Sequence, residues 1–302
     1  MNNIDQAQNK KIAVLDIGGT SIKSGIFQNG SLLNIKENDT NASLGGQYVV
    51  NKAMEILKSY GDVDGIGIST AGQVDFSKGM IRYANQNIPG YTGMRIKDIV
   101  EQEFSVPVVV ENDVNAAAVG EAHYGAGIGF QEFICLTYGT GVGGAIFLNG
   151  DIYRGSTFSA GEVGAMIMHP EDRNAEVDMY SGCYEKYAST TALVRKVMQL
   201  DESLTDGRKI FKALDRIEVK AAVDEWIEEI AFGLISLIHI LNPACVILGG
   251  GVMEQKYILE KVKENVMKNI MESYRHVFIT KTELGNKAGM FGAAALMMKQ
   301  LG

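Results

Sequence analysis

Two segments rich in glycine and threonine share one pattern, and they constrain the fold of this chain more than any other feature. Each lies between two apolar, strand-like runs, and each second run ends in an Asn-Gly pair. Backbone N–H groups in a turn without Cβ atoms can approach an anion closely, and a threonine hydroxyl adds a donor. The candidate phosphate-binding residues are Gly18, Gly19 and Thr20 in the first segment and Gly139, Thr140, Gly141 and Gly143 in the second. Two such hairpins predict a duplicated fold that holds a polyphosphate from both sides.

The chain has 302 residues and a formal net charge of −8, and this length suffices for two domains with substantial cores. The acidic balance disfavours nucleic acid and anionic membranes as partners, so a phosphate site must be local. Cys135, Cys183 and Cys245 are too sparse for a disulfide framework, and we expect a cytoplasmic protein. Residues 1–11 lack the apolar core of a secretory signal, and the most apolar helical stretch, 231–241, is too short to span a bilayer.

Hydrophobic periodicity predicts a similar order of elements in both halves of the chain. The first half has expected strands at 12–15, 24–27, 63–69 and 106–110 and helices at 47–59, 94–104 and 115–124. The second half has expected strands at 133–137, 144–148, 244–248 and 277–280 and helices at 190–200, 219–241, 257–273 and 288–301. This order indicates layered α/β domains. Residues 155–187 look irregular and polar, which is typical of substrate loops, and the domain boundary is expected near the glycines at 125–129.

The spacing of Gly139, Gly141 and Gly144 also matches a dinucleotide-binding pattern, but that pattern requires a following helix. Residues 145–148 are strand-like, so a Rossmann site is disfavoured, and the chain contains no P-loop pattern. The plain alternative is a tight hairpin whose glycines only supply positive φ angles. For one hairpin alone that alternative is the better one, whereas the matched pair favours phosphate binding.

Asp16 follows an apolar strand and adjoins the first glycine turn. A carboxylate there would hold Mg²⁺ through water beside the phosphates, and the alternative is a turn aspartate that bonds nearby backbone amides. Lys23, three residues past Thr20, is a candidate to neutralise phosphate charge, although most lysines are simply solvated.

Glu111, Asn112 and Asp113 follow a buried apolar strand and precede an alanine-rich helix. Polar residues at the carboxyl end of such a strand lie where α/β sheets bind ligands. Asp113 would accept a proton from a substrate hydroxyl as it attacks phosphorus, and Asn112 would bond a neighbouring hydroxyl. Helix capping by Asn112, Asp113 or Asn115 is the alternative.

Residues 242–251 are a strand followed by Gly249, Gly250 and Gly251. A backbone without side chains would let a flat adenine ring lie against it, and the alternative is a plain strand-to-helix turn. These glycines complete the candidate nucleotide site.

Together these segments resemble the ROK family of bacterial sugar kinases and repressors, in the actin/hexokinase-like superfamily. The matching segments are 16–20, 139–144, 242–252, 111–118, 160–164 and 181–185, in the family's order. The resemblance implies a duplicated bilobal (ribonuclease H-like) α/β fold, with one lobe of residues 10–124 plus 289–302 and another of 125–288. ATP and sugar would lie in the cleft between lobes, with Asp113 as general base.

The resemblance also implies the sugar contacts. Asn112, Glu162 and Glu185 would bond sugar hydroxyls, which suits carboxylates because each accepts two donors. Further candidates for the sugar site are Asn85, Ala71 and Gly72. A homodimer is implied as well.

Two departures from the family pattern bear on substrate and metal. The family's histidine after Gly-Glu-x-Gly is Ala165 here, and of the three cysteines in its zinc segment only Cys183 is present. A closed zinc site needs four good ligands, so we expect no structural zinc, with His169, Asp178 and Cys183 as a substitute set left open. Loss of the histidine leaves space near the anomeric end of the sugar, as in the family's β-glucoside kinases.

The sequence therefore predicts an ATP- and Mg²⁺-dependent kinase for the 6-hydroxyl of a hexose or β-glucoside, with the β-glucoside favoured. N-acetylmannosamine kinase and glucokinase are the alternatives within the family. A sugar-responsive regulator without its DNA-binding domain is the alternative of another class, but residues 1–11 leave no room for helix-turn-helix elements.

Overall fold

The computed structural model describes residues 10–302, which form two compact units. The first unit holds the described residues up to 129 together with 151–160 and 283–302, and the second holds 130–150 and 161–282. This division differs from the predicted lobes at residues 125–129, 151–160 and 283–288. Residues 1–9 lie outside the described residues, and with them lies most of segment 1–11, for which the sequence predicts neither a secretory signal nor helix-turn-helix elements.

The reassigned segments are held in the first unit by buried polar groups. The Glu121 side chain is fully buried and accepts hydrogen bonds from the backbone N–H groups of Ala126 (2.8 Å), Glu283 (3.1 Å) and Leu284 (2.9 Å). Segment 151–160 is held by the ion pair between Arg154 and Glu111. The first stretch of this unit ends at Gly129, at the edge of the glycine stretch 125–129 where the sequence predicts a boundary, whereas contacts between distant residues hold 151–160 and 283–302 in the same unit.

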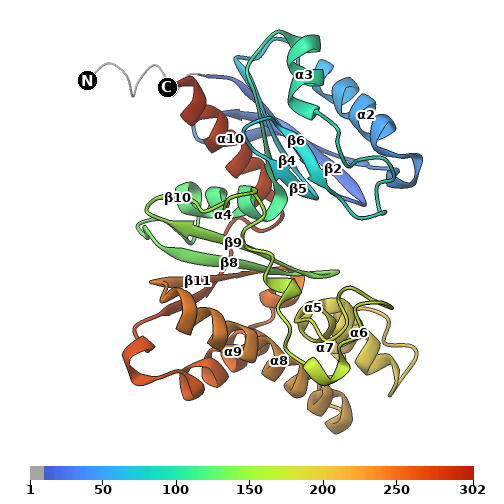
Figure 1. Ribbon diagram of the computed structural model, residues 1–302, viewed down its shortest axis with the longest axis vertical. Coiled ribbons are helices and arrows are strands. Elements are labelled where there is room, and N and C mark those ends of the chain that lie inside the picture. Colours follow the sequence, from blue (N-terminus) through green and yellow to red (C-terminus); the bar gives the residue numbers. More distant parts are fainter. Residues whose placement is uncertain (1–9) are drawn as a thin grey trace. The chain divides into compact units, whose positions relative to one another are not determined.

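The sheet of the first unit has the strand order β3-β2-β1-β4-β7. Its strands are β1 (Ile12–Ile17), β2 (Ser21–Gln28), β3 (Ser31–Asp39), β4 (Gly65–Thr70) and β7 (Val108–Asn112). β1, β2 and β3 are antiparallel neighbours, whereas β1, β4 and β7 run parallel. A separate antiparallel pair consists of β5 (Gln73–Asp75) and β6 (Met80–Tyr83). The helices of this unit are α2 (Gly46–Lys58), α3 (Ile96–Phe104), α4 (Asp113–Tyr124) and α10 (Ala288–Leu301) (Figure 1).

In the second unit the strand order is β9-β8-β11-β12. The strands are β8 (Phe133–Tyr138), β9 (Val142–Leu148), β11 (Cys245–Gly249) and β12 (Phe278–Lys281). The helices are α5 (Glu185–Ala188), α6 (Thr190–Met198), α7 (Gly207–Lys212), α8 (Ile217–Leu241) and α9 (Lys256–Asn269). The short strand β10 (Asp151–Ile152) belongs to segment 151–160. Single 3₁₀ turns cover 42–44, 163–165, 170–172, 251–254, 272–274 and 285–287.

The two sheets repeat one topology. In each, an antiparallel hairpin (β1-β2 or β8-β9) is extended on the side of its first strand by two parallel strands. The glycine turns lie at the tips of these two hairpins, so the predicted duplication is present in the strand order.

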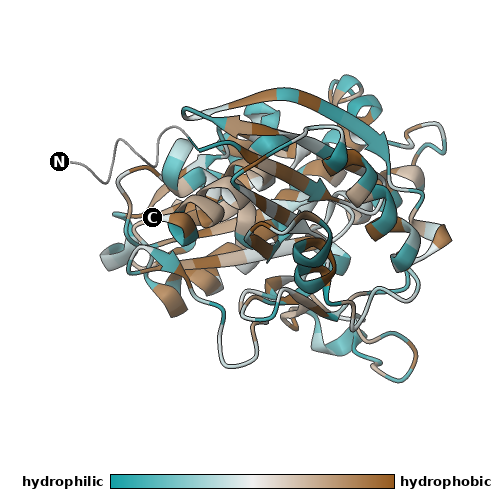
Figure 2. Cartoon of the chain, turned by 90° about the horizontal axis from the view of Figure 1, so that it is seen from above, coloured by the Kyte–Doolittle hydropathy of each residue, from teal (hydrophilic) through white to brown (hydrophobic). Residues whose placement is uncertain are grey.

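The core of each unit is built from the strands that the apolar runs predicted. β4 is buried along its whole length, and hydrophobic residues run along the strands of both sheets (Figure 2). α10 packs on α4, β1 and β4. The close approach of α10 needs glycine, because a Cβ at Gly67 would collide with the carbonyl group of Ala293, and one at Gly292 with that of Ala116. Among residues 10–302, no helix has the length and apolar character needed to cross a bilayer.

Candidate active site

Asp16 is the centre of the first candidate phosphate site. Parallel pairing of β1 with β4 sets Ser69 beside Asp16, and the Ser69 hydroxyl donates to Asp16 Oδ1 at 2.7 Å. Lys23 Nζ lies 3.8 Å from Asp16 Oδ2. Burial raises the pKa of Asp16, and the Ser69 hydrogen bond and the Lys23 charge oppose that rise. Lys23 is thus a counterion of Asp16, and its contact with phosphate stays a prediction.

The first glycine turn is fixed by its neighbours but open on one side. The Gly18 N–H donates to the Ser21 carbonyl at 2.9 Å, and the Thr40 hydroxyl donates to the Gly18 carbonyl at 2.7 Å. Gly19 and Thr20 are exposed, and a Cβ on Gly19 would have no heavy atom within 4 Å. Neither Gly18 nor Gly19 has a positive φ. The alternative that these glycines only supply positive φ is therefore wrong.

The second glycine turn, Gly139 to Gly144, is likewise open on one side. Gly139 and Thr140 are exposed, and a Cβ on Gly139 would meet nothing within 4 Å. The glycines at 139, 141, 143 and 144 all lack positive φ. Gly139 and Gly19 therefore need glycine neither for their backbone angles nor for packing within the chain, which leaves space that a ligand would fill.

Asn112 and Asp113 lie where β7 passes directly into α4. Asn112 Oδ1 accepts from the backbone N–H groups of Val114 (3.0 Å) and Asn115 (3.1 Å), so Asn112 caps the helix. Asn112 Nδ2 donates to the Gly72 carbonyl at 2.9 Å and to Asp113 Oδ1 at 2.8 Å. The capping alternative is thus confirmed for Asn112, and its side chain also orients Asp113.

The electrostatic surroundings of Asp113 suit a base. Burial and the nearby negative charge of Asp16 raise the pKa of Asp113 to about 7, although the Val114 N–H and the Asn112 side chain donate to it. A base with a pKa near the working pH exists in its ionised form and still accepts a proton readily.

Glu185 and Glu162 lie together next to the second glycine turn. The Glu185 carboxylate accepts the Val142 backbone N–H, and Oε2 lies 2.5 Å from the position that a Cβ on Gly141 would occupy. Burial raises the pKa of Glu185, and the negative charge of Glu162 raises it further. A Cβ on Gly164 would collide with the Val142 carbonyl, so a glycine at 164 is what permits this arrangement. The structure thus brings the two predicted sugar-binding carboxylates together.

The three glycines at the end of β11, of which Gly249 is its last residue, differ from one another. Gly250 has a φ of 103°, and a Cβ there would collide with the Tyr138 carbonyl. Gly249 packs against Thr137 and Thr282. Gly251 has no positive φ and nothing within 4 Å of a Cβ, so it alone leaves open space of the kind that an adenine ring would need.

The remaining sugar-site candidates fall into two groups. Ala71 and Gly72 follow β4, and the Gly72 carbonyl accepts the Asn112 side chain, so they adjoin the Asp113 segment. Asn85 is exposed, and its Oδ1 accepts the Asn87 N–H at 3.1 Å in a local turn. Its contact with a sugar stays a prediction.

The ROK family profile matches residues 12–300. The chain belongs to the ROK family. Relatives of this ROK protein include proteins that are named as sugar kinases. It is 32% identical over 294 residues to a β-glucoside kinase from Listeria monocytogenes, covering 94% of this chain and 96% of that protein.

Solved structures support the same family and confirm the predicted actin/hexokinase-like fold. A candidate N-acetylmannosamine kinase from Listeria monocytogenes superposes with a TM-score of 0.87 at 29% identity, covering 97% of this chain and 100% of the other. A ROK glucokinase from Streptomyces griseus, solved with glucose and AMPPNP, superposes with a TM-score of 0.80 at 30% identity. The match covers 95% of this chain and 98% of the glucokinase.

The segment that matches the family's zinc region is held by protein contacts in this ROK protein. His169 Nε2 lies 3.0 Å from Glu229 Oε2, and Asp178 pairs with Lys186 at 2.7 Å. Arg173 donates to the Ser181 carbonyl at 2.9 Å and approaches Cys183 Sγ at 3.5 Å. His169, Asp178 and Cys183 therefore do not converge, and within residues 10–302 no cluster of three His, Cys, Asp or Glu side chains is arranged to hold a metal ion.

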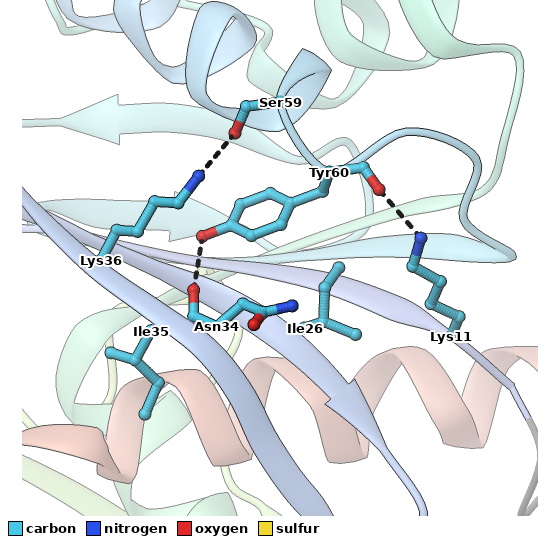
Figure 3. Close-up of a pocket in the computed structure, with 7 residues that line it drawn as sticks. All are labelled: Lys11, Ile26, Asn34, Ile35, Lys36, Ser59 and Tyr60. Carbon is cyan, nitrogen blue, oxygen red and sulfur yellow. Dashed lines mark hydrogen bonds between the residues drawn. The ribbon is translucent and has the colours of Figure 1, made fainter.

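The ROK protein also has a surface cavity of about 400 Å³ that contains none of the predicted site residues. It is lined by Lys11, Ile26, Asn34, Ile35, Lys36, Ser59 and Tyr60 (Figure 3). Lys11 donates to the Tyr60 carbonyl and Lys36 to the Ser59 hydroxyl, so both ammonium groups are already engaged at the end of α2.

Sequence reasoning missed two residues that support the site. Ser69 bonds Asp16 because β4 lies parallel to β1, and its place at the end of an expected strand was the only signal. Arg154 forms an ion pair with Glu111 across 43 positions of sequence, and no motif marks it.

Proposed function

We propose that this ROK protein transfers the γ-phosphate of ATP to the 6-hydroxyl of a hexose or a β-glucoside, with a β-glucoside as the favoured substrate. The observation that carries the proposal is the surroundings of Asp113. Its carboxylate has a pKa of about 7, lies at the end of a parallel strand and shares the first unit with the open turn at Gly19.

Asp113 acts as the general base. Its Oδ1 accepts from Asn112 Nδ2 and from the Val114 N–H, so the substrate proton goes to Oδ2. As the sugar oxygen bonds to the γ-phosphorus, the bond from that phosphorus to the bridging oxygen breaks and ADP leaves with the electron pair. Positioning supplies most of the catalysis in such reactions.

The other groups bind and orient the substrates. The N–H groups of the two glycine turns bind the phosphates of ATP, and Gly251 leaves room for its base. Glu162 and Glu185 accept hydrogen bonds from sugar hydroxyls. Excluding water from the reacting groups prevents hydrolysis of ATP.

Asp16 fits a site for Mg²⁺ bound through water. It is a carboxylate whose side chain is only 19% exposed, and its negative charge raises the pKa of Asp113, so a cation beside it would relieve that repulsion. When bound, Mg²⁺ neutralises charge on the phosphates.

Ala165 favours a β-glucoside over a free monosaccharide. Its side chain is a methyl group on an exposed residue, three positions after Glu162. A small residue there leaves space for an aglycone or second sugar. Glucose and N-acetylmannosamine are the alternative substrates, because glucose is bound in the Streptomyces griseus structure and the Listeria structure is a candidate N-acetylmannosamine kinase.

A coupled assay of ATP consumption with Mg²⁺ and cellobiose, glucose or N-acetylmannosamine tests the proposal. We expect the highest kcat/KM for cellobiose. Ala165→His should lower that value and spare glucose, because the larger ring fills the space for the second sugar. A strong preference of the unaltered protein for either monosaccharide would contradict the β-glucoside assignment, and no turnover of any sugar would contradict the kinase.

We further propose a cytoplasmic homodimer. Burial of all three cysteines suits a reducing compartment. The long helix α8 exposes Phe232 and Ile240, and sedimentation equilibrium would measure the oligomeric state.

A further inference from the structure

Glu111 is a buried carboxylate surrounded by hydrogen-bond donors. Its side chain is 1% exposed. Oε2 accepts from Arg154 Nε at 2.8 Å, and Oε1 accepts from the Asn112 backbone N–H at 2.8 Å and from Asn115 Nδ2 at 3.2 Å. Because every one of these partners is a donor, the arrangement needs an ionised carboxylate at Glu111.

Arg154 is fixed from several directions. Its guanidinium carbon lies 3.9 Å from the centre of the Phe76 ring. One terminal nitrogen donates to the Ile152 carbonyl at 3.3 Å and lies 3.8 Å from the Asp151 carboxylate. The Arg154 side chain is only 14% exposed. A guanidinium held in this way is the one positive charge paired directly with Glu111 among the described residues.

The pair is connected to Asp113 through a single residue. Glu111 accepts the backbone N–H of Asn112, while the Asn112 side chain caps α4 and donates to Asp113 Oδ1 at 2.8 Å. Any shift of the backbone at Asn112 therefore changes the orientation of the carboxylate at Asp113.

We propose that Arg154 is a positioning residue for phosphoryl transfer: by keeping Glu111 ionised, it fixes Asn112 and thereby the orientation of Asp113. This inference rests on the proposed function, in which Asp113 is the base. Arg154 itself touches neither substrate nor reacting atoms in this assignment.

Removal of the Arg154 charge has a defined consequence. Burial already raises the pKa of Glu111, and Arg154 is the strongest opposing influence. Asp151 lies beside the guanidinium and is itself paired with Lys299 at 2.7 Å, with His123 nearby, and Asp113 lies two residues along the chain from Glu111. Without Arg154, Glu111 would take up a proton at higher pH and become a donor itself. It would then no longer accept every hydrogen bond around it.

The test compares Arg154→Met, Glu111→Gln and the double variant by kcat over pH 5.5 to 9. Arg154→Met should lower kcat at neutral pH by about tenfold or more, since small misplacements of a catalytic group are costly. The fall in kcat on the acid side should begin at a higher pH in Arg154→Met than in the parent. In the double variant the amide oxygen introduced at position 111 accepts the Asn112 N–H without needing a counterion, so kcat should return to within about threefold of the parent. KM for ATP should stay unchanged.

Arg154→Lys and Arg95→Met are the controls. The lysine keeps the positive charge and should keep the parent's acid limb. Arg95 pairs with Asp98 on the exposed surface of α3, and its loss should leave kcat unaffected. Thermal melts of every variant show whether it is folded.

A purely structural role of Arg154, as an anchor of segment 151–160 on Phe76, predicts no rescue by the second substitution. If the double variant is folded and as slow as Arg154→Met, the inference is overturned. Failure of the proposed function gives a different result, because Asp113→Asn would then retain activity.

Discussion

Asp113 is the residue on which the proposed chemistry depends most. Asp113→Asn keeps the size of the side chain and an oxygen that can accept the Val114 N–H, so the start of α4 should remain intact. We expect kcat to fall by about 10²- to 10⁴-fold, the usual contribution of a general base, while KM for the sugar changes little. Steady-state kinetics with a thermal melt checks this result. A folded variant with kcat near that of the parent would remove Asp113 from the mechanism.

The raised pKa of Asp113 predicts the pH dependence of turnover. A general base must be ionised, and Asp113 is protonated below its pKa of about 7. This pKa belongs to the chain without bound nucleotide or Mg²⁺, so it governs kcat/KM for ATP, which reports the protein before the nucleotide binds. The value of kcat/KM should therefore fall as pH decreases through 7, approaching about tenfold per unit at the acid end, and should level off above pH 7 until other groups titrate. A kcat/KM for ATP that stays constant down to pH 5 would mean that the base has an ordinary carboxylate pKa, and it would contradict the assignment.

Among the elements, the glycines of the two turns and the glycines of the core differ in whether an added Cβ would have space. A Cβ at Gly139 would have space, and the φ angle of this residue is not positive. Gly139→Ala should therefore leave the free energy of unfolding nearly unchanged and raise KM for ATP. At Gly67 a Cβ collides with the α10 backbone, so Gly67→Ala should cost about 1–3 kcal/mol of stability through overpacking. Urea unfolding and ATP kinetics on both variants separate the two effects. Equal KM values for the parent and Gly139→Ala would show that ATP does not approach this turn.

Apolar patterns in the sequence predicted most strands and helices, and they failed where no apolar pattern exists. β3 was missed because nearly its whole length is exposed, so its side chains do not alternate between polar and apolar. The helix expected at 115–124 begins two residues earlier, since Asn112 serves as its cap. The helix expected at 257–273 ends at Asn269, and a 3₁₀ turn follows. Element ends are set by individual hydrogen bonds, which periodicity does not encode.

Across the whole chain, the duplicated α/β fold could be predicted because two copies of one pattern occur in one sequence. The glycine turns, Asp16 and the segment at 111–113 were predicted from their places at strand ends. The division into units could not be predicted in full, because segment 151–160 joins the first unit through the pairing of Arg154 with Glu111. Ser69 and Arg154 were missed for the same reason: their partners are chosen by the fold and are distant in sequence.

Duplication leads to a prediction for the chain as a whole. If both turns bind the phosphates of one nucleotide, AMPPNP with cellobiose should slow amide hydrogen exchange at residues 18–20 and at residues 139–144. These turns have exposed residues and open space at Gly19 and Gly139, so their amides should exchange rapidly without ligand. Hydrogen-exchange mass spectrometry measures both segments in one experiment, and the exposed strand β3 serves as a control that should not change. Bound ligand should also raise the free energy of unfolding, by about 2.7 kcal/mol at a concentration of 100 times Kd. Protection of one turn alone would mean that the second copy of the motif serves the fold and does not bind the nucleotide.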